Sequence, residues 1–131
     1  MTLTYVDASV LILASREKHG ASQRALEFLG DPNRTFAASW FLKLEVITQA
    51  AFHKRVDELA FYERFFESVS VWVKEDALVE AALREASTYG LHAMDALHIV
   101  AAAQVGAEFI TFENPRKPIH RTRSVRVTFL E

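Results

Sequence analysis

Four acidic residues stand in apolar surroundings in this sequence, and they are the side chains best suited to do chemistry. One lies within Leu91–Ala103, a run of small and aliphatic residues, and another directly follows the apolar run Leu3–Val6. A carboxylate in such surroundings has to be hydrogen-bonded, paired or bound to a metal ion, because burial of a bare charge is costly. The four acids are Asp7, Glu45, Asp95 and Glu113.

Asp7 and Asp95 each have a structural alternative to a chemical role. Each lies at the predicted start of a helix, the first over Ala8–Ala14 and the second over residues 95–105. An aspartate in that position can accept hydrogen bonds from the N–H groups of the first helical turn. Ser9 could cap the first helix or hydrogen-bond to Asp7, and the sequence leaves both options open.

Glu45 lies on the predicted helix Trp40–His53. Lys43 on this helix should face water, and Glu45 is turned by about 200° from it, toward the core side. The structural alternative is a partly exposed acid that is bonded to Gln49 or to a distant arginine. Both interpretations of Glu45 remain open.

A set of carboxylate ligands favours Mg²⁺ or Mn²⁺, which prefer oxygen and bind phosphates. Two such ions about 3.5–4 Å apart activate water and stabilise the leaving oxygen in phosphodiester hydrolysis. His92 and His98 do not extend this set, because residues six apart lie about 120° apart around a helix axis. A helical zinc site needs histidines three or four residues apart. We expect no zinc site and interpret His98 as a core or interface histidine.

The C-terminal part of the chain is basic. No acidic residue occurs from Asn114 to Leu130, although the net charge of the whole chain is −2. Lysine and arginine side chains there could contact phosphates. The alternative is a solvated segment whose charges serve solubility. The candidate phosphate-binding residues are Arg116, Lys117, Arg121 and Arg123.

The order of the predicted elements indicates an α/β fold with a mainly parallel sheet and helices on both of its faces. The 131 residues are enough for one domain with a sizeable core. The predicted strands are Leu3–Val6, Thr35–Ala38, Val69–Val73, Phe109–Phe112 and Val125–Phe129. The other predicted helices are Ser22–Leu29, Glu58–Glu67 and Asp76–Tyr89, the last with Leu78, Val79, Ala82, Leu83 and Ala86 facing inward.

Several classes of protein are disfavoured by what the sequence lacks. It contains no cysteine, which excludes disulfides and thiolate chemistry, and no Gly-x-Ser-x-Gly or glycine-rich phosphate loop. No apolar run approaches the roughly 20 residues of a membrane span. The first residues lack the features of a signal peptide. We therefore expect a cytoplasmic protein that does not bind membranes.

The second half of the third predicted helix and the helix after it are rich in aromatic residues. Most of these rings should belong to the core. Their number exceeds what one core face needs, so some could form a surface for self-association or for a partner. The residues are Phe52, Phe61, Tyr62, Phe65 and Phe66.

The chain resembles the PIN domain family, and in particular its small stand-alone members, the VapC-type toxins of toxin–antitoxin pairs. The resemblance is carried by Tyr5–Ser9, the isolated Glu45, Met94–Ala103 and Phe109–Glu113, in the family's order and spacing. It spans nearly the whole chain, and the segment around Asp95 is its most specific part. One departure is Glu113, which stands where the family usually has an aspartate.

The resemblance implies one PIN-like domain over residues 1–131, a three-layer α/β/α sandwich with a short, mainly parallel sheet. It also implies a metal-dependent endoribonuclease that uses Mg²⁺ or Mn²⁺, forms a homodimer and is inhibited by an antitoxin. Asp7, Glu45, Asp95 and Glu113 would then be both catalytic residues and metal ligands, with Ser9 and Thr111 as hydrogen-bond partners beside them. The alternative is a catalytically silent PIN fold that binds RNA or a protein.

Overall fold

The computed structural model describes residues 1–16 and 20–131. The described part of the chain contains one five-stranded sheet of order β3-β2-β1-β4-β5, and every neighbouring pair is parallel. The predicted parallel sheet is therefore confirmed. The strands are β1 Thr2–Val6, β2 Arg34–Ala38, β3 Val71–Trp72, β4 Glu108–Thr111 and β5 Val127–Phe129.

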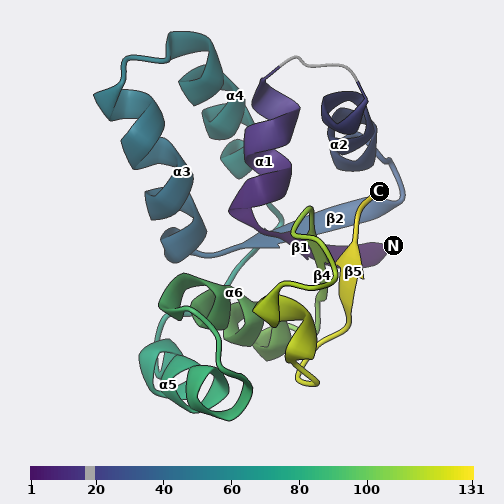
Figure 1. The fold of residues 1–131 in the computed structure, drawn as a ribbon. Coiled ribbons are helices and arrows are strands. Elements are labelled where there is room, and N and C mark those ends of the chain that lie inside the picture. Colours follow the sequence, from purple (N-terminus) through teal and green to yellow (C-terminus); the bar gives the residue numbers. More distant parts are fainter. Residues whose placement is uncertain (17–19) are drawn as a thin grey trace.

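Helices cover both faces of the sheet, which confirms the three-layer α/β/α architecture. Helices α1 to α4 lie on one side of the sheet, and α5 and α6 lie on the other (Figure 1). Among the described helices, none is both long and apolar enough to cross a membrane. The helices are α1 Ala8–Ser15, α2 Ala21–Leu29, α3 Trp40–Phe52, α4 Val56–Glu67, α5 Leu78–Tyr89 and α6 Ala93–Gln104, with a short 3₁₀ helix η1 at Pro118–Arg121.

The central strand β1 explains where a site can form. Tyr5 pairs with Ala37 of β2 on one side and with Phe109 of β4 on the other. After β1 the chain builds β2 and β3 on one side, and then returns through α5 and α6 to build β4 and β5 on the other. In such sheets, ligands bind beyond the carboxyl ends of the strands where the strand order reverses. Asp7 follows β1 and Glu113 follows β4 at this edge.

Helix α6 fits closely in its layer because its buried face is made of small residues. Ala96, Ala101 and Ala102 have no measurable exposed area, and Ile99 is equally buried. The helix starts shortly after Gly90, which ends α5 in the left-handed conformation at φ +69°. This close packing brings the first turn of α6 to the carboxyl end of β1 and β4.

Three expectations are corrected by the structure. Strand β3 is shorter than predicted, with only Val71 and Trp72 in the ladder. Val79 and Leu83 are exposed, because α5 packs through the face that carries Leu78, Ala82 and Glu85, about 100° away. Lys43 does not simply face water, because its Nζ lies 4.6 Å from the centre of the Trp40 ring.

The aromatic side chains of α3 and α4 are mostly core. Tyr62, Phe65 and Phe66 are buried, and Phe61 is half-buried. Phe52, at the end of α3, is 79% exposed, and Trp40, at its start, is 56% exposed. Of the five aromatic residues singled out in the sequence, Phe52 alone is exposed.

Candidate active site

Asp7 is the N-cap of α1, which is the structural role considered for it. Its Oδ1 accepts the backbone N–H of Ser9 at 3.0 Å and that of Val10 at 3.4 Å. The residue is only 5% exposed. Burial raises the pKa of Asp7, while hydrogen bonds from Ser9 and Thr111 act in the opposite direction by stabilising the charged form.

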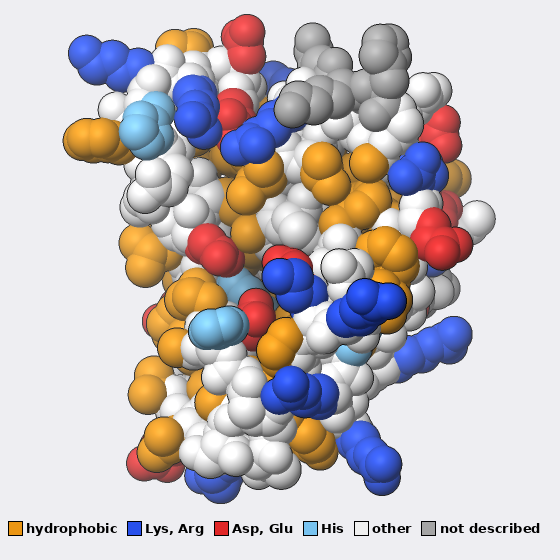
Figure 2. All heavy atoms as spheres, in the orientation of Figure 1, with side chains coloured by type: hydrophobic (Ala, Val, Ile, Leu, Met, Phe, Trp, Pro, Cys, Tyr) orange, Lys and Arg blue, Asp and Glu red, His pale blue; other side chains and the backbone are white. Residues whose placement is uncertain are grey.

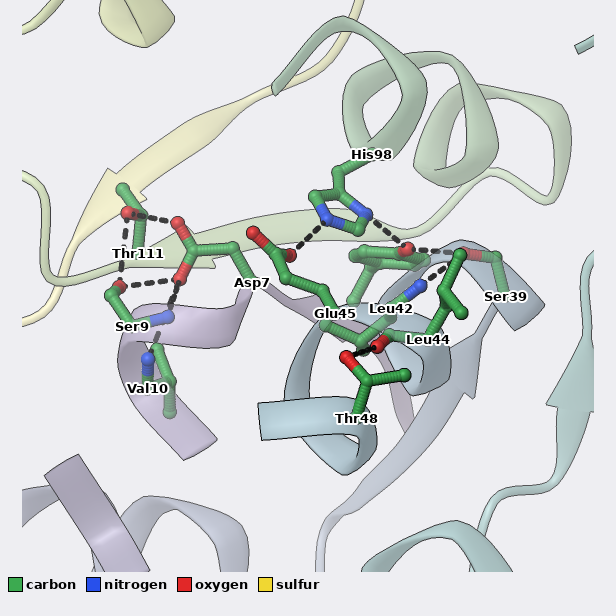
Figure 3. Close-up of polar contacts among 11 residues, drawn as sticks. Asp7, Ser9, Val10, Ser39, Leu42, Leu44, Glu45, Thr48, His98 and Thr111 are labelled. Carbon is green, nitrogen blue, oxygen red and sulfur yellow. Dashed lines mark hydrogen bonds and ion pairs between the residues drawn. The ribbon is translucent and has the colours of Figure 1, made fainter. Parts of the chain in front are cut away.

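Two hydroxyl groups tie Asp7 to the end of β4. Ser9 Oγ donates to Oδ1 of Asp7 and Thr111 Oγ1 donates to Oδ2, each at a distance of 2.5 Å (Figure 3). The two hydroxyl oxygens also accept backbone N–H groups just beyond β4. Ser9 Oγ accepts from Phe112 at 2.9 Å, and Thr111 Oγ1 accepts from Glu113 at 2.9 Å. Ser9 is therefore a hydrogen-bond partner of Asp7, and the N-cap of α1 is Asp7 rather than Ser9.

Asp95 lies in the first turn of α6, but it is not the N-cap. That position belongs to His92, and no side chain caps this helix. In the described part of the chain, no hydrogen bond or ion pair involves the Asp95 carboxylate. The helix-cap interpretation of Asp95 is therefore wrong. Burial raises the pKa of Asp95, whereas His98 lowers it, and the negative charges of Glu113 and Glu45 raise it again.

The partner of Glu45 is a histidine rather than the expected Gln49 or arginine. Oε1 of Glu45 lies 2.8 Å from Nε2 of His98 (Figure 3). The side chain of His98 is 2% exposed and that of Glu45 is 35% exposed. Glu45 therefore has one oxygen held inside the protein while its side chain still reaches solvent.

His98 is a core residue, as predicted, and it also belongs to the site. Its Nδ1 lies 2.7 Å from Tyr5 Oη, which lies 2.7 Å from Ser39 Oγ. Ser39 is the N-cap of α3 and accepts the N–H of Leu42 at 3.2 Å. Sequence reasoning placed His98 in the core or at an interface, but it did not find the contacts with Tyr5 and Glu45, because they join residues far apart in the chain.

Glu113 lies two residues after the end of β4. Its side chain is half-buried, and its backbone carbonyl accepts a hydrogen bond from Nε2 of His120 at 2.8 Å. The charge of Glu113 acts on Asp95, as the raised pKa of Asp95 indicates. Glu113 and Glu45 therefore both lie within electrostatic reach of Asp95.

The basic C-terminal residues are exposed, but they do not form one cluster. Arg116 and Lys117 follow Glu113 closely in the chain. Arg121 instead donates from Nη1 to the carbonyl of Tyr89 at 3.2 Å, at the end of α5. Arg123 lies between Thr122 and Ser124, whose hydroxyls donate to Glu85 at 2.5 and 2.6 Å.

The chemistry of the acidic group fits a divalent cation, although the side chains are not already closed around one position. Within residues 1–16 and 20–131, no three histidine or acidic side chains meet at a common metal position. Asp95 nevertheless has no hydrogen-bond partner and experiences two nearby negative charges. A cation would relieve this repulsion, and carboxylate oxygens are the ligands that Mg²⁺ and Mn²⁺ prefer. Asp7, Glu45 and Asp95 would hold it, with Glu113 beside them.

A pocket of about 260 Å³ lies next to Glu45, and sequence reasoning did not find it. Arg16, His53 and Arg55 contribute positive or ionisable groups to its lining. Arg55 lies 3.9 Å from Glu58. In Figure 2, acidic side chains lie near the middle of the face, and basic side chains lie on both sides of them.

The same fold occurs in solved toxin–antitoxin structures. The matching chain of VapBC2 from Rickettsia felis, bound to a DNA fragment from its promoter, has a TM-score of 0.76 at 13% identity, covering 99% of this chain and 100% of that chain. A toxin–antitoxin complex from Klebsiella pneumoniae matches with a TM-score of 0.72 at 17% identity, with 98% of each chain covered. VapBC-1 from nontypeable Haemophilus influenzae matches with a TM-score of 0.73 at 16% identity, also with 98% of each chain covered.

Sequence comparison gives the family directly. No curated protein matches the chain in sequence. The family model of the PIN domain matches residues 4–116, which include the four acids and their hydrogen-bond partners. The chain belongs to the PIN domain family.

Proposed function

We propose that this protein is a metal-dependent endoribonuclease and the toxin of a VapBC-type toxin–antitoxin pair. The observation that carries the proposal is Asp95, a half-buried carboxylate within reach of the charges of Glu45 and Glu113. Among the residues that the structure describes, it has no hydrogen-bond partner. A purely structural acid would be expected to have a donor, because an unpaired buried charge is costly. A carboxylate that experiences the negative charges of two other acids is typical of a cation site.

Each acid would contribute differently. Oδ2 of Asp7 accepts one hydrogen bond, from Thr111, and so keeps a lone pair for a cation. Glu45 is oriented by His98, and Asp95 is not engaged elsewhere. A bound Mg²⁺ or Mn²⁺ would supply an activated water molecule and neutralise charge on the phosphate. Glu113 would contact the cation through water, because its side chain is longer than that of the aspartate usual at this place in the family.

An RNA strand that crosses Glu45 and Glu113 would find positive charge on both sides. Arg116 and Lys117 follow Glu113, and the pocket beside Glu45 contains Arg16 and Arg55. Phosphate contacts of this kind supply most of the affinity for nucleic acids and position the strand. This distribution supports a polymeric substrate over a small molecule.

The toxin role is supported by likeness to toxin–antitoxin structures from three organisms, two of them VapBC, at 13–17% sequence identity. We propose an antitoxin that covers the acidic group, and a homodimer as the active form. Induced expression in bacteria should then arrest growth. Co-expression of a small DNA-binding protein encoded next to this gene should relieve the arrest.

The enzymatic proposal is tested with a generic RNA, with Mg²⁺, Mn²⁺ or EDTA. We expect cleavage with either metal, none in EDTA, and loss of cleavage in Asp95→Asn and Asp7→Asn. Asp57→Asn is a matched control, because Asp57 lies exposed in the first turn of α4. Asp57→Asn should cleave like the wild type.

Four outcomes would contradict this proposal. Cleavage that persists in EDTA, or in Asp95→Asn, would place the activity outside the acidic group. Binding of RNA or antitoxin without cleavage under any metal condition would instead favour the silent binding module. Growth arrest by Asp95→Asn at normal expression would separate toxicity from cleavage.

A further inference from the structure

Four side chains from three parts of the chain form one continuous line of hydrogen bonds. The line runs from Ser39 Oγ to Tyr5 Oη at 2.7 Å, from Tyr5 Oη to His98 Nδ1 at 2.7 Å, and from His98 Nε2 to Glu45 Oε1 at 2.8 Å. Ser39 and Tyr5 have no exposed area. Figure 3 shows the line ending at the Glu45 carboxylate. Water therefore cannot replace its inner members.

The groups at the two ends fix the direction in which the protons are donated. Nε2 of His98 has to carry a proton, because two acceptors at 2.8 Å would repel each other and the carboxylate can only accept. In a singly protonated ring, Nδ1 is then an acceptor, and Tyr5 has to donate to it. Ser39 in turn donates to Tyr5 Oη, while its own oxygen accepts the N–H of Leu42.

The reverse direction leaves a group unsatisfied. If His98 donated from Nδ1, Tyr5 would have to donate to Ser39, and the Ser39 proton would have no acceptor among the described residues. A buried donor without an acceptor is strongly disfavoured. Burial also raises the pKa of Tyr5, so the phenol keeps the proton that it donates.

We propose that His98 is a positioning residue, held by Tyr5 as an acceptor at Nδ1, that donates from Nε2 and fixes Glu45 Oε1 so that Oε2 is left for the cation. This inference rests on the proposed function, since it gives Glu45 a cation to bind. A free glutamate side chain samples several rotamers, and fixing it in advance reduces the entropy lost on binding. Partners that orient ligands in this way tune metal affinity.

The proton positions can be measured without metal or RNA. Two-dimensional ¹H–¹⁵N NMR of the histidine ring should give a pyrrole-like Nε2 and a pyridine-like Nδ1 for His98. His53 is exposed and serves as an internal comparison. A proton on Nδ1 would overturn the proposed direction. Tyr5→Phe removes the donor and should shift the Nδ1 resonance.

The positioning role is measured by Mn²⁺ binding in calorimetry. His98→Leu removes both contacts and should weaken Mn²⁺ binding roughly 10–100-fold. In His98→Gln the amide oxygen can accept from Tyr5 and the amide nitrogen can donate to Glu45, so binding should recover most of the way to wild type. Tyr62→Phe is a matched control, because it removes another buried tyrosine hydroxyl, bonded to Glu58 and Ser15.

The outcomes separate this inference from the proposed function. A wild-type protein that binds no Mn²⁺ would overturn the proposed function, and the role of His98 with it. Wild-type binding that His98→Leu leaves unchanged, in protein shown to be folded by circular dichroism, would overturn only the inference. Equal losses in His98→Gln and His98→Leu would also overturn it, because a positioning role predicts rescue by the glutamine.

Discussion

Thr111, the last residue of β4, donates its hydroxyl to Oδ2 of Asp7, the residue that follows β1, with 2.5 Å between the oxygens. This one contact joins two neighbouring strands at the point in the sheet where the strand order reverses. It also donates a hydrogen bond to a carboxyl group that is only 5% exposed. The contact couples the stability of the fold to the ionisation of the site.

Replacing Thr111 by valine should therefore destabilise the protein most where Asp7 is charged. The change keeps the shape of the side chain but removes a donor to a buried carboxylate, which should cost about 1–3 kcal/mol at neutral pH. Without this donor the pKa of Asp7 rises further, so the loss of stability shrinks as the pH falls and the carboxyl becomes protonated. Urea unfolding at neutral and acidic pH measures this difference. Thr111→Ser, which keeps a hydroxyl, should stay close to wild type.

The arrangement of the fold could be predicted because its signals are local. Asp7 and Ser39 precede their helices as N-caps, and Gly90 ends α5. The alternation of strands and helices was sufficient to predict a parallel sheet with helices on both faces. The inward face of α5 was predicted less well, because Val79 and Leu83 continue the apolar pattern onto an exposed face of the helix.

The partners within the candidate site could not be predicted in the same way. The hydrogen bond between His98 and Glu45 joins residues 53 positions apart, and that between Tyr5 and His98 spans 93. Helix periodicity can place His98 in the core, but it does not say which acid from another helix will meet it. For Asp95, the helix start was predicted two residues too late, which made a first-turn residue look like a cap.

The basic residues after Glu113 should govern how RNA binding depends on salt. Changing Arg116 and Lys117 to glutamine should weaken binding and reduce the slope of log affinity against log salt by roughly 0.7 for each lost phosphate contact with a single strand. Arg84→Gln, a change of an exposed arginine on α5, is the control. Fluorescence anisotropy at several salt concentrations measures the slope. An unchanged slope would make the segment a solvated loop.

Arg121→Gln should have a smaller effect on RNA binding than Arg116→Gln. The guanidinium of Arg121 donates to the carbonyl of Tyr89, so part of its role is to hold η1 against α5. We expect a change in melting temperature for Arg121→Gln and a change in the salt slope for Arg116→Gln. Both variants can be measured by the same anisotropy series and a thermal melt. A larger slope change for Arg121→Gln would reverse this assignment.

Phe52 is the most exposed aromatic residue of α3 and α4. Its ring is 79% exposed, so Phe52→Ser should change the free energy of unfolding by less than about 0.5 kcal/mol. Phe66→Ala, in the core, should cost about 3–5 kcal/mol. If Phe52 lies in a dimer or antitoxin interface, Phe52→Ser should also weaken that association in analytical ultracentrifugation. Unchanged association would leave Phe52 as a surface residue.

The sharpest test of the acidic group is Asp95→Asn, measured by thermal melts in EDTA and in Mn²⁺. Burial raises the pKa of Asp95 in the folded protein, so its ionisation costs more there than in the unfolded chain. The stabilisation that comes from holding Asp95 protonated is fully present below the pKa of aspartate in the unfolded chain, about 4. It is lost as the pH rises through the raised pKa of Asp95 in the folded protein. In EDTA at neutral pH, Asp95→Asn should therefore melt higher than wild type, and the gain should shrink near pH 4.

Added Mn²⁺ should reverse this order. A ligand that binds only the folded state stabilises it by mass action, so the wild type should gain melting temperature with Mn²⁺ concentration and Asp95→Asn should gain much less. Asp57→Asn, in the exposed first turn of α4, should respond to Mn²⁺ like the wild type. If Asp95→Asn melts no higher than wild type in EDTA and responds equally to Mn²⁺, then Asp95 neither repels its acidic neighbours nor binds a cation.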